Sequence, residues 1–306
     1  MPTASWLARD GVPLVRLTSE RLILDVAPSL GGRVVSVHHR GTGHEFLWQR
    51  PGAPLVPCNP GEAYDPAFWG GIDELLPNDI PEIVQGVALP DHGELWTSQL
   101  TAQVVGDTLR LRGGLPVSGL HYERDMVLAD DAPEVRLRYT LTNTTTRRQP
   151  VMFKLHAAIA IAPGDEIVCP ARRARVADPA WSRWGDSPAF AWPSPRPGAR
   201  ADVVPARDGS TDFLHLYELE RGEIAWRRPA TGHLFRYRFD PAVFPCAWLF
   251  ASYGGFDNHY TAILEPCTTM PMSVVEAART GHCLILEPGA TVTTNVTMFA
   301  GLQDEA

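Results

Sequence analysis

The sequence lacks the long apolar runs that mark membrane-spanning helices. No stretch of its 306 residues approaches the ~18 uninterrupted apolar residues that such a helix needs. The N-terminal segment MPTASWLARDGVPLV also lacks a basic region followed by an apolar one, which is the pattern of a secretory signal. These absences predict a cytoplasmic protein that does not enter a membrane.

Charge of one sign is not concentrated anywhere in the chain. The net charge is −8, and the sequence contains no run of five like charges. A nucleic-acid-binding surface or a polybasic membrane-binding segment would require clustered Lys and Arg. We therefore expect a small ligand that is not a polyanion, and no nucleic-acid partner. The sequence carries no signal of the oligomeric state.

Cysteine pairs are also missing. The five cysteines are scattered along the chain without a CxxC motif. This pattern indicates neither a disulfide framework nor a zinc-binding knuckle. We expect buried thiols.

Helical periodicity is rare, whereas alternation of period two is frequent. The chain has 26 Gly and 28 Pro, and turn residues interrupt the alternation about every ten residues, as in all-β proteins. In 134–143, Val135, Leu137, Tyr139 and Leu141 alternate with polar residues, which predicts a sheet with one solvated face. Other predicted strands include 21–27, 33–39, 151–161, 233–239 and 260–266. The pattern predicts an all-β fold of two packed antiparallel sheets.

Only one helix is predicted, in MSVVEAARTG, with Pro271 before it and Gly281 after it. Residues 178–212 show neither period and are rich in Pro, Gly, Ser and Trp, which is typical of either a lid over a binding site or a flexible connector. Because we find no shift in composition and no internal repeat, we expect a single domain spanning 1–306.

The segment from Ala67 to Trp96 combines glycines, prolines and polar side chains. Gly70 and Gly71 permit positive φ or a close approach of two backbones, and three prolines predict a long ordered loop. Its hydrogen-bonding groups and flat rings suit a sugar; they are Trp69, Asp73, Glu74, Asn78, Asp91, His92, Glu94 and Trp96. The alternative is a turn-rich surface segment whose carboxylates cap backbone amides.

His156 lies in an alternating segment, on the face opposite to its large apolar residues. Its neighbours on that face include Lys154, Ala158 and Ala160, and the small side chains leave room for a substrate. A neutral histidine near pH 7 can act as a general acid or base. The alternative is a core histidine that bonds a backbone carbonyl.

Glu265 ends an apolar strand and precedes Pro266. Partial burial beside Ile263 and Leu264 would raise the pKa of this carboxyl group and suit it to act as a base. A second Leu-Glu-Pro triplet contains Glu287, which we interpret as part of a hairpin turn.

These segments, in this order on an all-β chain, resemble the aldose 1-epimerase (galactose mutarotase) family. The similarity is greatest to its bacterial aldose-epimerase-like and hexose-6-phosphate-epimerase-like branch. It is carried by LGGRVVSV, FWGGIDELLPND with LPDHGELW, the strand of His156, the LEP of Glu265 and the closing LEPGATVTTNVTMF. The resemblance spans nearly the whole chain and implies a large antiparallel β-supersandwich with a sugar in a cleft on one sheet.

The resemblance also implies the chemistry. Glu265 would take the proton of the anomeric O1 hydroxyl, His156 would protonate the ring oxygen, and His92 would support the ring oxygen or a neighbouring hydroxyl. Neither a metal nor an organic cofactor is needed for this acid–base reaction. The residues expected to bind the sugar are Trp69, Asp73, Glu74, Asn78, Trp96 and Arg33.

Two features depart from the family pattern. Trp69 stands where the branch has an arginine before Gly-Gly, which argues against a phosphorylated hexose unless Arg33, Arg172, Arg173 or Arg175 substitutes for that cation. An acidic sugar ligand is expected between His156 and Glu265, and either Asp178 or Asp212 could serve.

Two other functions remain possible on this scaffold. One is a non-catalytic carbohydrate-binding protein, since one fold carries several functions. The other is a polysaccharide lyase or hydrolase, for which Tyr122 and Arg124 would be candidates. Their alternation is more typical of a solvated strand face.

Overall fold

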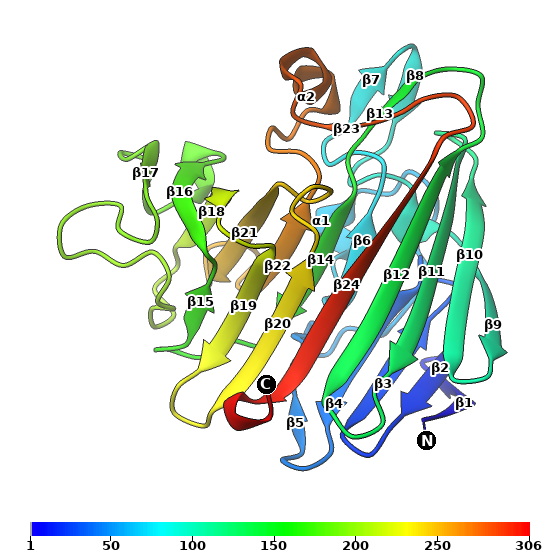
Figure 1. Cartoon of the computed structure of the whole chain (residues 1–306). Helices are drawn as coiled ribbons and strands as arrows, with labels where there is room; N and C mark the ends of the chain where they lie inside the picture. Colours follow the sequence, from blue (N-terminus) through cyan, green and yellow to red (C-terminus); the bar gives the residue numbers. More distant parts are fainter. Residues whose placement is uncertain (1) are drawn as a thin grey trace.

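The computed structural model describes residues 2–306, and two large antiparallel sheets dominate this part of the chain (Figure 1). The first sheet has the order β1 (Thr3–Arg9), β2 (Val12–Thr18), β3 (Leu22–Ala27), β4 (Arg33–His39), β6 (Ile72–Leu75), β14 (Lys154–Ile159), β22 (Tyr260–Cys267), β21 (Cys246–Tyr253), β18 (Thr211–Leu219), β16 (Ala171–Val176) and β17 (Ala189–Ala191), with β5 (His44–Glu45) paired to β4.

The second sheet has the order β15 (Glu166–Val168), β19 (Glu223–Arg228), β20 (His233–Phe239), β24 (Thr291–Leu302), β12 (Glu134–Asn143), β11 (Leu120–Leu128), β10 (Thr108–Leu115) and β9 (Thr101–Val105). Two small two-stranded sheets complete the strands: β7 (Glu82–Val84) with β8 (Val87–Leu89), and β13 (Gln149–Val151) with β23 (Leu284–Leu286). The predicted all-β fold is confirmed.

Helices are short in the described part of the chain. They are α1 (Tyr64–Ala67), α2 (Val274–Thr280) and the 3₁₀ turns η1 (Leu95–Thr97), η2 (Pro179–Trp181) and η3 (Gln303–Glu305). The predicted helix is confirmed as α2, because Ser273 caps its first turn and Gly281 ends it at φ 73°. Within residues 2–306, no helix has the length and apolar character needed to cross a membrane.

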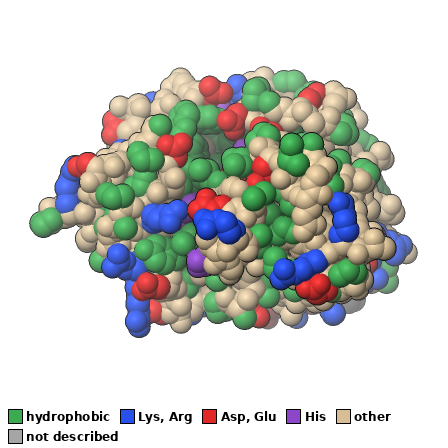
Figure 2. Space-filling view, turned by 90° about the horizontal axis from the view of Figure 1, so that it is seen from above, with side chains coloured by type: hydrophobic (Ala, Val, Ile, Leu, Met, Phe, Trp, Pro, Cys, Tyr) green, Lys and Arg blue, Asp and Glu red, His purple; other side chains and the backbone are tan. Residues whose placement is uncertain are grey.

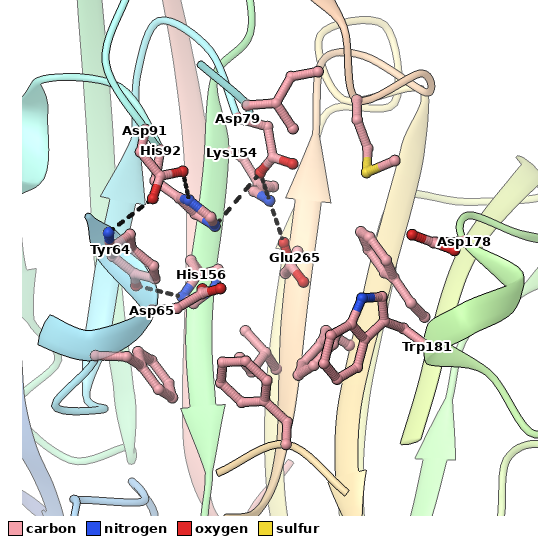
Figure 3. Close-up of a pocket in the computed structure, with 17 residues that line it drawn as sticks. Tyr64, Asp65, Asp79, Asp91, His92, Lys154, His156, Asp178, Trp181 and Glu265 are labelled. Carbon is pink, nitrogen blue, oxygen red and sulfur yellow. Dashed lines mark hydrogen bonds and ion pairs between the residues drawn. The ribbon is translucent and has the colours of Figure 1, made fainter. Parts of the chain in front are cut away.

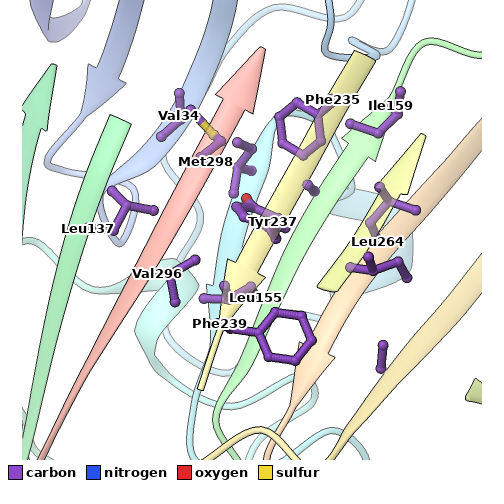
Figure 4. Packing of buried hydrophobic residues seen from close by; sticks show 14 of the residues in the cluster. Val34, Leu137, Leu155, Ile159, Phe235, Tyr237, Phe239, Leu264, Val296 and Met298 are labelled. Atoms are coloured by element: carbon purple, nitrogen blue, oxygen red, sulfur yellow. The ribbon is translucent and has the colours of Figure 1, made fainter. Parts of the chain in front are cut away.

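The core lies between the two sheets and follows from alternation along their strands. On β12, Val135, Leu137, Tyr139 and Leu141 are buried, while the residues between them are exposed or half-buried, as predicted. Figure 4 shows the inward-facing side chains of both sheets packed together; they include Val34, Leu155, Ile159, Phe235, Tyr237, Phe239, Leu264, Val296 and Met298. Burying these apolar surfaces holds the two layers face to face.

The segment 67–96 is not the long loop that we expected. It contributes β6 to the middle of the first sheet, between β4 and β14, and the β7–β8 pair at the end of the molecule. The glycine prediction is confirmed, since Gly70 and Gly71 have φ of 93° and 82°, and a Cβ on Gly70 would lie 2.2 Å from the carbonyl oxygen of Trp48. The glycines let the chain enter the sheet beside Trp48.

The expected solvated position of Tyr122 and Arg124 is wrong. Both side chains are fully buried on the core face of β11. The Arg124 guanidinium donates to Glu74 of β6, and the Tyr139 hydroxyl donates to the same carboxylate at 2.9 Å. This ion pair links the two sheets, and it removes both residues from any solvent-facing lyase site.

Figure 2 shows the surface of the molecule from above, where arginine side chains are scattered among acidic and apolar ones. This distribution is that of a mixed surface rather than of a continuous cationic patch.

We predict that Arg124→Met lowers the free energy of unfolding by about 3–5 kcal/mol, because it leaves the Glu74 carboxylate buried without its cation. The double variant Arg124→Met/Glu74→Gln should recover part of this loss. Urea unfolding measures both values. A single variant that loses less than about 1 kcal/mol would show that the pair behaves like an exposed one.

Candidate active site

A pocket of about 270 Å³ opens on the outer face of the first sheet, over its central strands (Figure 3). Its polar lining comprises Tyr64, Asp65, Asp79, Asp91, His92, Lys154, His156, Asp178 and Glu265. Its apolar lining comprises Phe68, Ile80, Trp181, Phe213, Phe250, Phe256, Ile263 and Met272. The volume lies below the range typical of drug-sized ligands, so the pocket suits one sugar ring better than a chain of them.

Strand register brings His156 and Glu265 together. On β14 and β22, Lys154 pairs with Cys267 and Ala157 with Leu264, so the intervening register places His156 opposite Glu265. Directly opposed residues of an antiparallel pair project to the same face. Figure 3 shows both side chains pointing into the pocket, with His92 nearby. The two residues come from distant parts of the chain and meet through the pairing of β14 with β22.

Glu265 is held by a buried ammonium group. Lys154 Nζ lies 2.7 Å from Glu265 Oε2 and 2.6 Å from Asp79 Oδ1, and all three side chains are at most 6% exposed. Burial raises the pKa of Glu265 even though Lys154 opposes this effect. Burial also disfavours the charged lysine, but Asp79 and Glu265 outweigh it and raise the pKa of Lys154. The ammonium is therefore a fixed positive charge at the base of the pocket.

The expectation that Glu265 ends its strand and is only partly buried is wrong. It lies within β22, which continues through Pro266 to Cys267, and its side chain is 2% exposed. The predicted rise in the pKa of Glu265 is confirmed in direction.

His156 is oriented by a chain of buried polar groups. Its Nδ1 lies 3.3 Å from the Tyr64 hydroxyl, which donates at 2.9 Å to Asp73 Oδ2, and Arg33 Nε donates at 2.6 Å to Asp73 Oδ1. Since the single Tyr64 proton goes to the closer, negatively charged carboxylate, His156 Nδ1 must be the donor to Tyr64. The neutral ring then presents Nε2 as an acceptor. Burial, with Lys154 nearby, lowers the pKa of His156 well below its usual value and keeps the ring neutral.

His92 lies in a strained backbone conformation between two carboxylates. Its φ is 54°, in the left-handed region that residues with a Cβ atom rarely adopt. Its Nδ1 lies 2.8 Å from Asp91 Oδ1, its Nε2 lies 3.9 Å from Asp79 Oδ1, and the ring stacks on Tyr64 at 4.2 Å. Although burial opposes it, His92 helps to hold the pKa of Asp91 and of Asp79 below the usual range.

The segment 178–212 supplies part of the pocket wall. Asp178 and Trp181, at η2, line the pocket, and the Trp181 ring lies 5.6 Å from that of Phe256. Of the two acidic residues considered above, Asp178 reaches the pocket, whereas Asp212 is fully buried and binds Arg183. Asp178 also accepts from the backbone of Ala180 at 2.9 Å.

None of the six residues expected to bind the sugar lines this pocket. Arg33 and Asp73 lie behind His156, as described above. Glu74 points into the core, because neighbouring residues of a strand face opposite sides. The remaining three are also buried: Asn78 donates to the carbonyls of Ile80 and Pro90, Trp96 packs edge-on against Tyr64, and Trp69 belongs to an apolar cluster with Leu14 and Leu55.

Three features of the pocket were not predicted from the sequence: Tyr64, Asp79 and the site role of Lys154. For Lys154 the sequence contains a signal, because it is the only lysine in the chain, beside 26 arginines. It also precedes His156 by two residues and therefore shares its face of β14. For Tyr64, which lies in a Pro-rich segment, we find no comparable signal.

Comparisons with known proteins give a fold but no sequence family. No family model matches the chain, and no curated protein matches it. A predicted aldose 1-epimerase from Klebsiella pneumoniae has a TM-score of 0.77 at 14% identity, covering 96% of this chain and 81% of the other. A predicted aldose 1-epimerase from Escherichia coli K12 has a TM-score of 0.72 at 17% identity, covering 99% and 100%.

A galactose mutarotase-like protein from Clostridium acetobutylicum has a TM-score of 0.70 at 12% identity, covering 99% of this chain and 98% of the other. The chain has the galactose mutarotase-like fold. The resemblance noted in the sequence is thus confirmed at the level of the fold. At these identities the comparison does not extend to activity or substrate, which must be argued from the pocket.

The single lysine gives a direct test of this geometry. An amine-reactive N-hydroxysuccinimide ester should leave Lys154 unmodified in the folded protein, because its amine is buried and protonated, and should modify it after denaturation. Peptide mass spectrometry measures both states. Rapid modification of Lys154 in the folded protein would contradict the buried ion pairs.

Proposed function

We propose that this protein is an isomerase that interconverts the anomers of a free monosaccharide by opening and reclosing the pyranose ring. The observation that carries the proposal is the convergence of Glu265, His156 and His92 on one small pocket of a galactose mutarotase-like fold. Ring opening needs one group that accepts a proton and one that donates a proton at opposite ends of a hemiacetal.

Glu265 is the base in this proposal. Its carboxylate takes the O1 proton as the C1–O1 bond becomes a carbonyl and the C1–O5 bond breaks. After rotation about C1–C2, O5 attacks the other face of C1 and Glu265 returns the proton to O1. The apolar surroundings of Glu265 favour this transfer, because they weaken the solvation of the free carboxylate.

The hydrogen bonds favour His92 over His156 as the donor to O5. The resemblance implies His156, but its neutral ring presents Nε2 without a proton, as shown above. His92 Nδ1 instead lies 2.8 Å from Asp91 Oδ1 and its Nε2 lies 3.9 Å from Asp79 Oδ1, so both ring nitrogens face ionised carboxylates, which can only accept hydrogen bonds. In this assignment His92 protonates O5 as the ring opens and takes that proton back as O5 attacks C1 on closure, and His156 Nε2 accepts a hydrogen bond from a sugar hydroxyl.

The charge of the pocket favours an uncharged sugar. Its described lining contains the carboxyl groups of Asp65, Asp79, Asp91, Asp178 and Glu265, against the single ammonium of Lys154. That ammonium is already engaged by two carboxylates. A phosphate or carboxylate on the sugar would therefore meet repulsion without a free cation. The aromatic wall around Phe256 and Trp181 offers stacking surfaces for the C–H face of a sugar ring.

The proposal predicts faster relaxation of optical rotation when the protein is added to fresh α-anomers of a panel of aldoses. Glu265→Gln should lower kcat by about 10²–10⁴-fold, because the amide cannot accept the O1 proton. Glu287→Gln is the matched control, since this exposed glutamate lies in a turn and should leave the rate unchanged. Unchanged relaxation for every aldose would reject the function. If sugars still quenched tryptophan fluorescence, the non-catalytic binding protein would replace it.

We also predict the acid limb of the pH profile. A base must be ionised to act, so kcat/KM should be full above the pKa of Glu265 and should fall as the pH decreases through it. Because burial raises this pKa, the limb should lie above the ordinary glutamate value of about 4.3. Polarimetry over a pH series measures it. A limb at or below the ordinary value would contradict the assignment of Glu265 as the base.

A further inference from the structure

We propose that Lys154 is the positioning residue that keeps Glu265 ionised and fixes the direction of its carboxylate in the pocket. This inference deepens the proposed function and rests on it for the role of Glu265. It assigns a task to a residue outside the acid–base set that the resemblance implied.

The geometry makes Lys154 a bridge between two carboxylates. Its Nζ is within 2.7 Å of both Asp79 Oδ1 and Glu265 Oε2, and its side chain is 3% exposed. The ammonium also lies 4.3 Å from the centre of the Trp248 ring, which is favourable for a cation. Trp248 pairs with Glu265 across β21 and β22, so one ring supports both members of the ion pair.

The need for this cation follows from the burial of its partners. Glu265 and Asp79 contact the same ammonium, and each is inside the protein. Without a positive charge, two neighbouring buried carboxylates cannot both remain ionised, and one of them takes up a proton. A protonated Glu265 could not accept the O1 proton of a sugar.

A lysine meets this requirement better than an arginine. Its ammonium is a compact charge with three donors, whereas a guanidinium is a broad plane that suits bidentate pairing with one carboxylate. The chain otherwise uses arginine at every cationic position, including the buried pairs of Arg33 and Arg124. The raised pKa of Lys154 also excludes it as a neutral amine that could form an imine with an opened sugar.

Other ionisable groups lie near the ion pairs of Lys154. Asp79 and His92 lie on the segment after β6, Tyr64 on α1, His156 on β14 and His215 on β18. Burial keeps His156 and His215 neutral by lowering their pKa values, and it raises the pKa of Tyr64. The effect of Lys154 on the pKa of Glu265 must therefore be separated from the effect of His92, the remaining histidine of the pocket.

The test is the titration of Glu265 in the wild type, Lys154→Met and Lys154→Arg, followed by carbon NMR of carboxyl-labelled glutamate. The Glu265→Gln variant assigns the signal, and the titrations are repeated in a His92→Asn background. Methionine matches the length of lysine without its charge. In Lys154→Met we expect the titration midpoint of Glu265 to rise by about one pH unit or more, which is a tenfold change in the proton-binding constant of this carboxyl group. Lys154→Arg should stay near the wild type.

A matched control removes a different ion pair. Arg228 binds the buried Asp165 at 2.9 Å and does not line the pocket. Arg228→Met should lower thermal stability without moving the Glu265 midpoint. Equal midpoints in the wild type and Lys154→Met would overturn the proposal, and so would equal shifts in Lys154→Met and Lys154→Arg. A shift that disappears in the His92→Asn background would assign the effect to His92 and also overturn it.

The wild-type protein provides a second test if Lys154→Met does not fold. Because the chain has one lysine, labelling with ¹⁵N-lysine gives one side-chain ammonium signal. That signal should change in the same pH step as the Glu265 carboxyl and lose this step in Glu265→Gln. Persistence of the step in Glu265→Gln would overturn the proposal.

Activity then separates this proposal from the proposed function. If the protein is a mutarotase, Lys154→Met should lose about tenfold or more in kcat/KM at pH values below the acid limb of the wild type and regain it as the pH rises through the displaced midpoint. KM alone should change little. If no sugar is turned over but the Glu265 midpoint moves as predicted, the role of Lys154 stands and the isomerase function fails.

Discussion

The ion pairs of Lys154 are the constraint on which the pocket depends. A carboxylate placed in the middle of a buried sheet costs several kcal/mol unless a cation and hydrogen bonds accompany it. Lys154 supplies that cation to Glu265 and Asp79. The same rule holds nearby, because Arg33 accompanies Asp73 and Arg124 accompanies Glu74. Each acidic group on the central strands is thus compensated, and Glu265 is the one whose pairing leaves it facing a cavity.

Strand register converts these local pairings into a site. Asp73 pairs with His156 across β6 and β14, Glu265 with Trp248 across β22 and β21, and Trp248 with His215 across β21 and β18. With His156 opposite Glu265, these residues form one transverse row on the outer face of the sheet. A shift of one residue on β14 would turn His156 into the core and Leu155 toward the pocket. The apolar packing of Leu155 and Ile159 between the sheets therefore also holds His156 toward the pocket on the outer face.

Much of the fold could be predicted because its longer strands alternate cleanly. The bounds of β4, β12 and β20 match the segments predicted from their apolar pattern. β6 was missed because its four residues, two of them acidic, are all buried, and their burial depends on cations from other strands. The apolar pattern of a sequence does not show which cations from other strands will neutralise a buried carboxylate.

The site was only partly predictable for the same reason. His92, His156 and Glu265 meet in the pocket, as the resemblance implied, but the residues expected to bind the sugar do not line it. Asp73 and Glu74 point to opposite faces of the sheet because they are neighbours on β6, a strand that was predicted to be part of a loop. Lys154 was predicted on the same strand face as His156. Its role in the site, however, depends on Asp79, which contacts it from a distant segment of the chain.

A crystal structure of the protein soaked with a panel of hexoses and pentoses would show whether the Glu265 carboxylate faces the anomeric centre of a bound sugar. We expect one sugar in the pocket, with O1 within hydrogen-bond distance of the Glu265 carboxylate, Lys154 still bound to Glu265, and the ring oxygen facing His92. A sugar bound elsewhere on the molecule, or one whose anomeric carbon points away from Glu265, would contradict it.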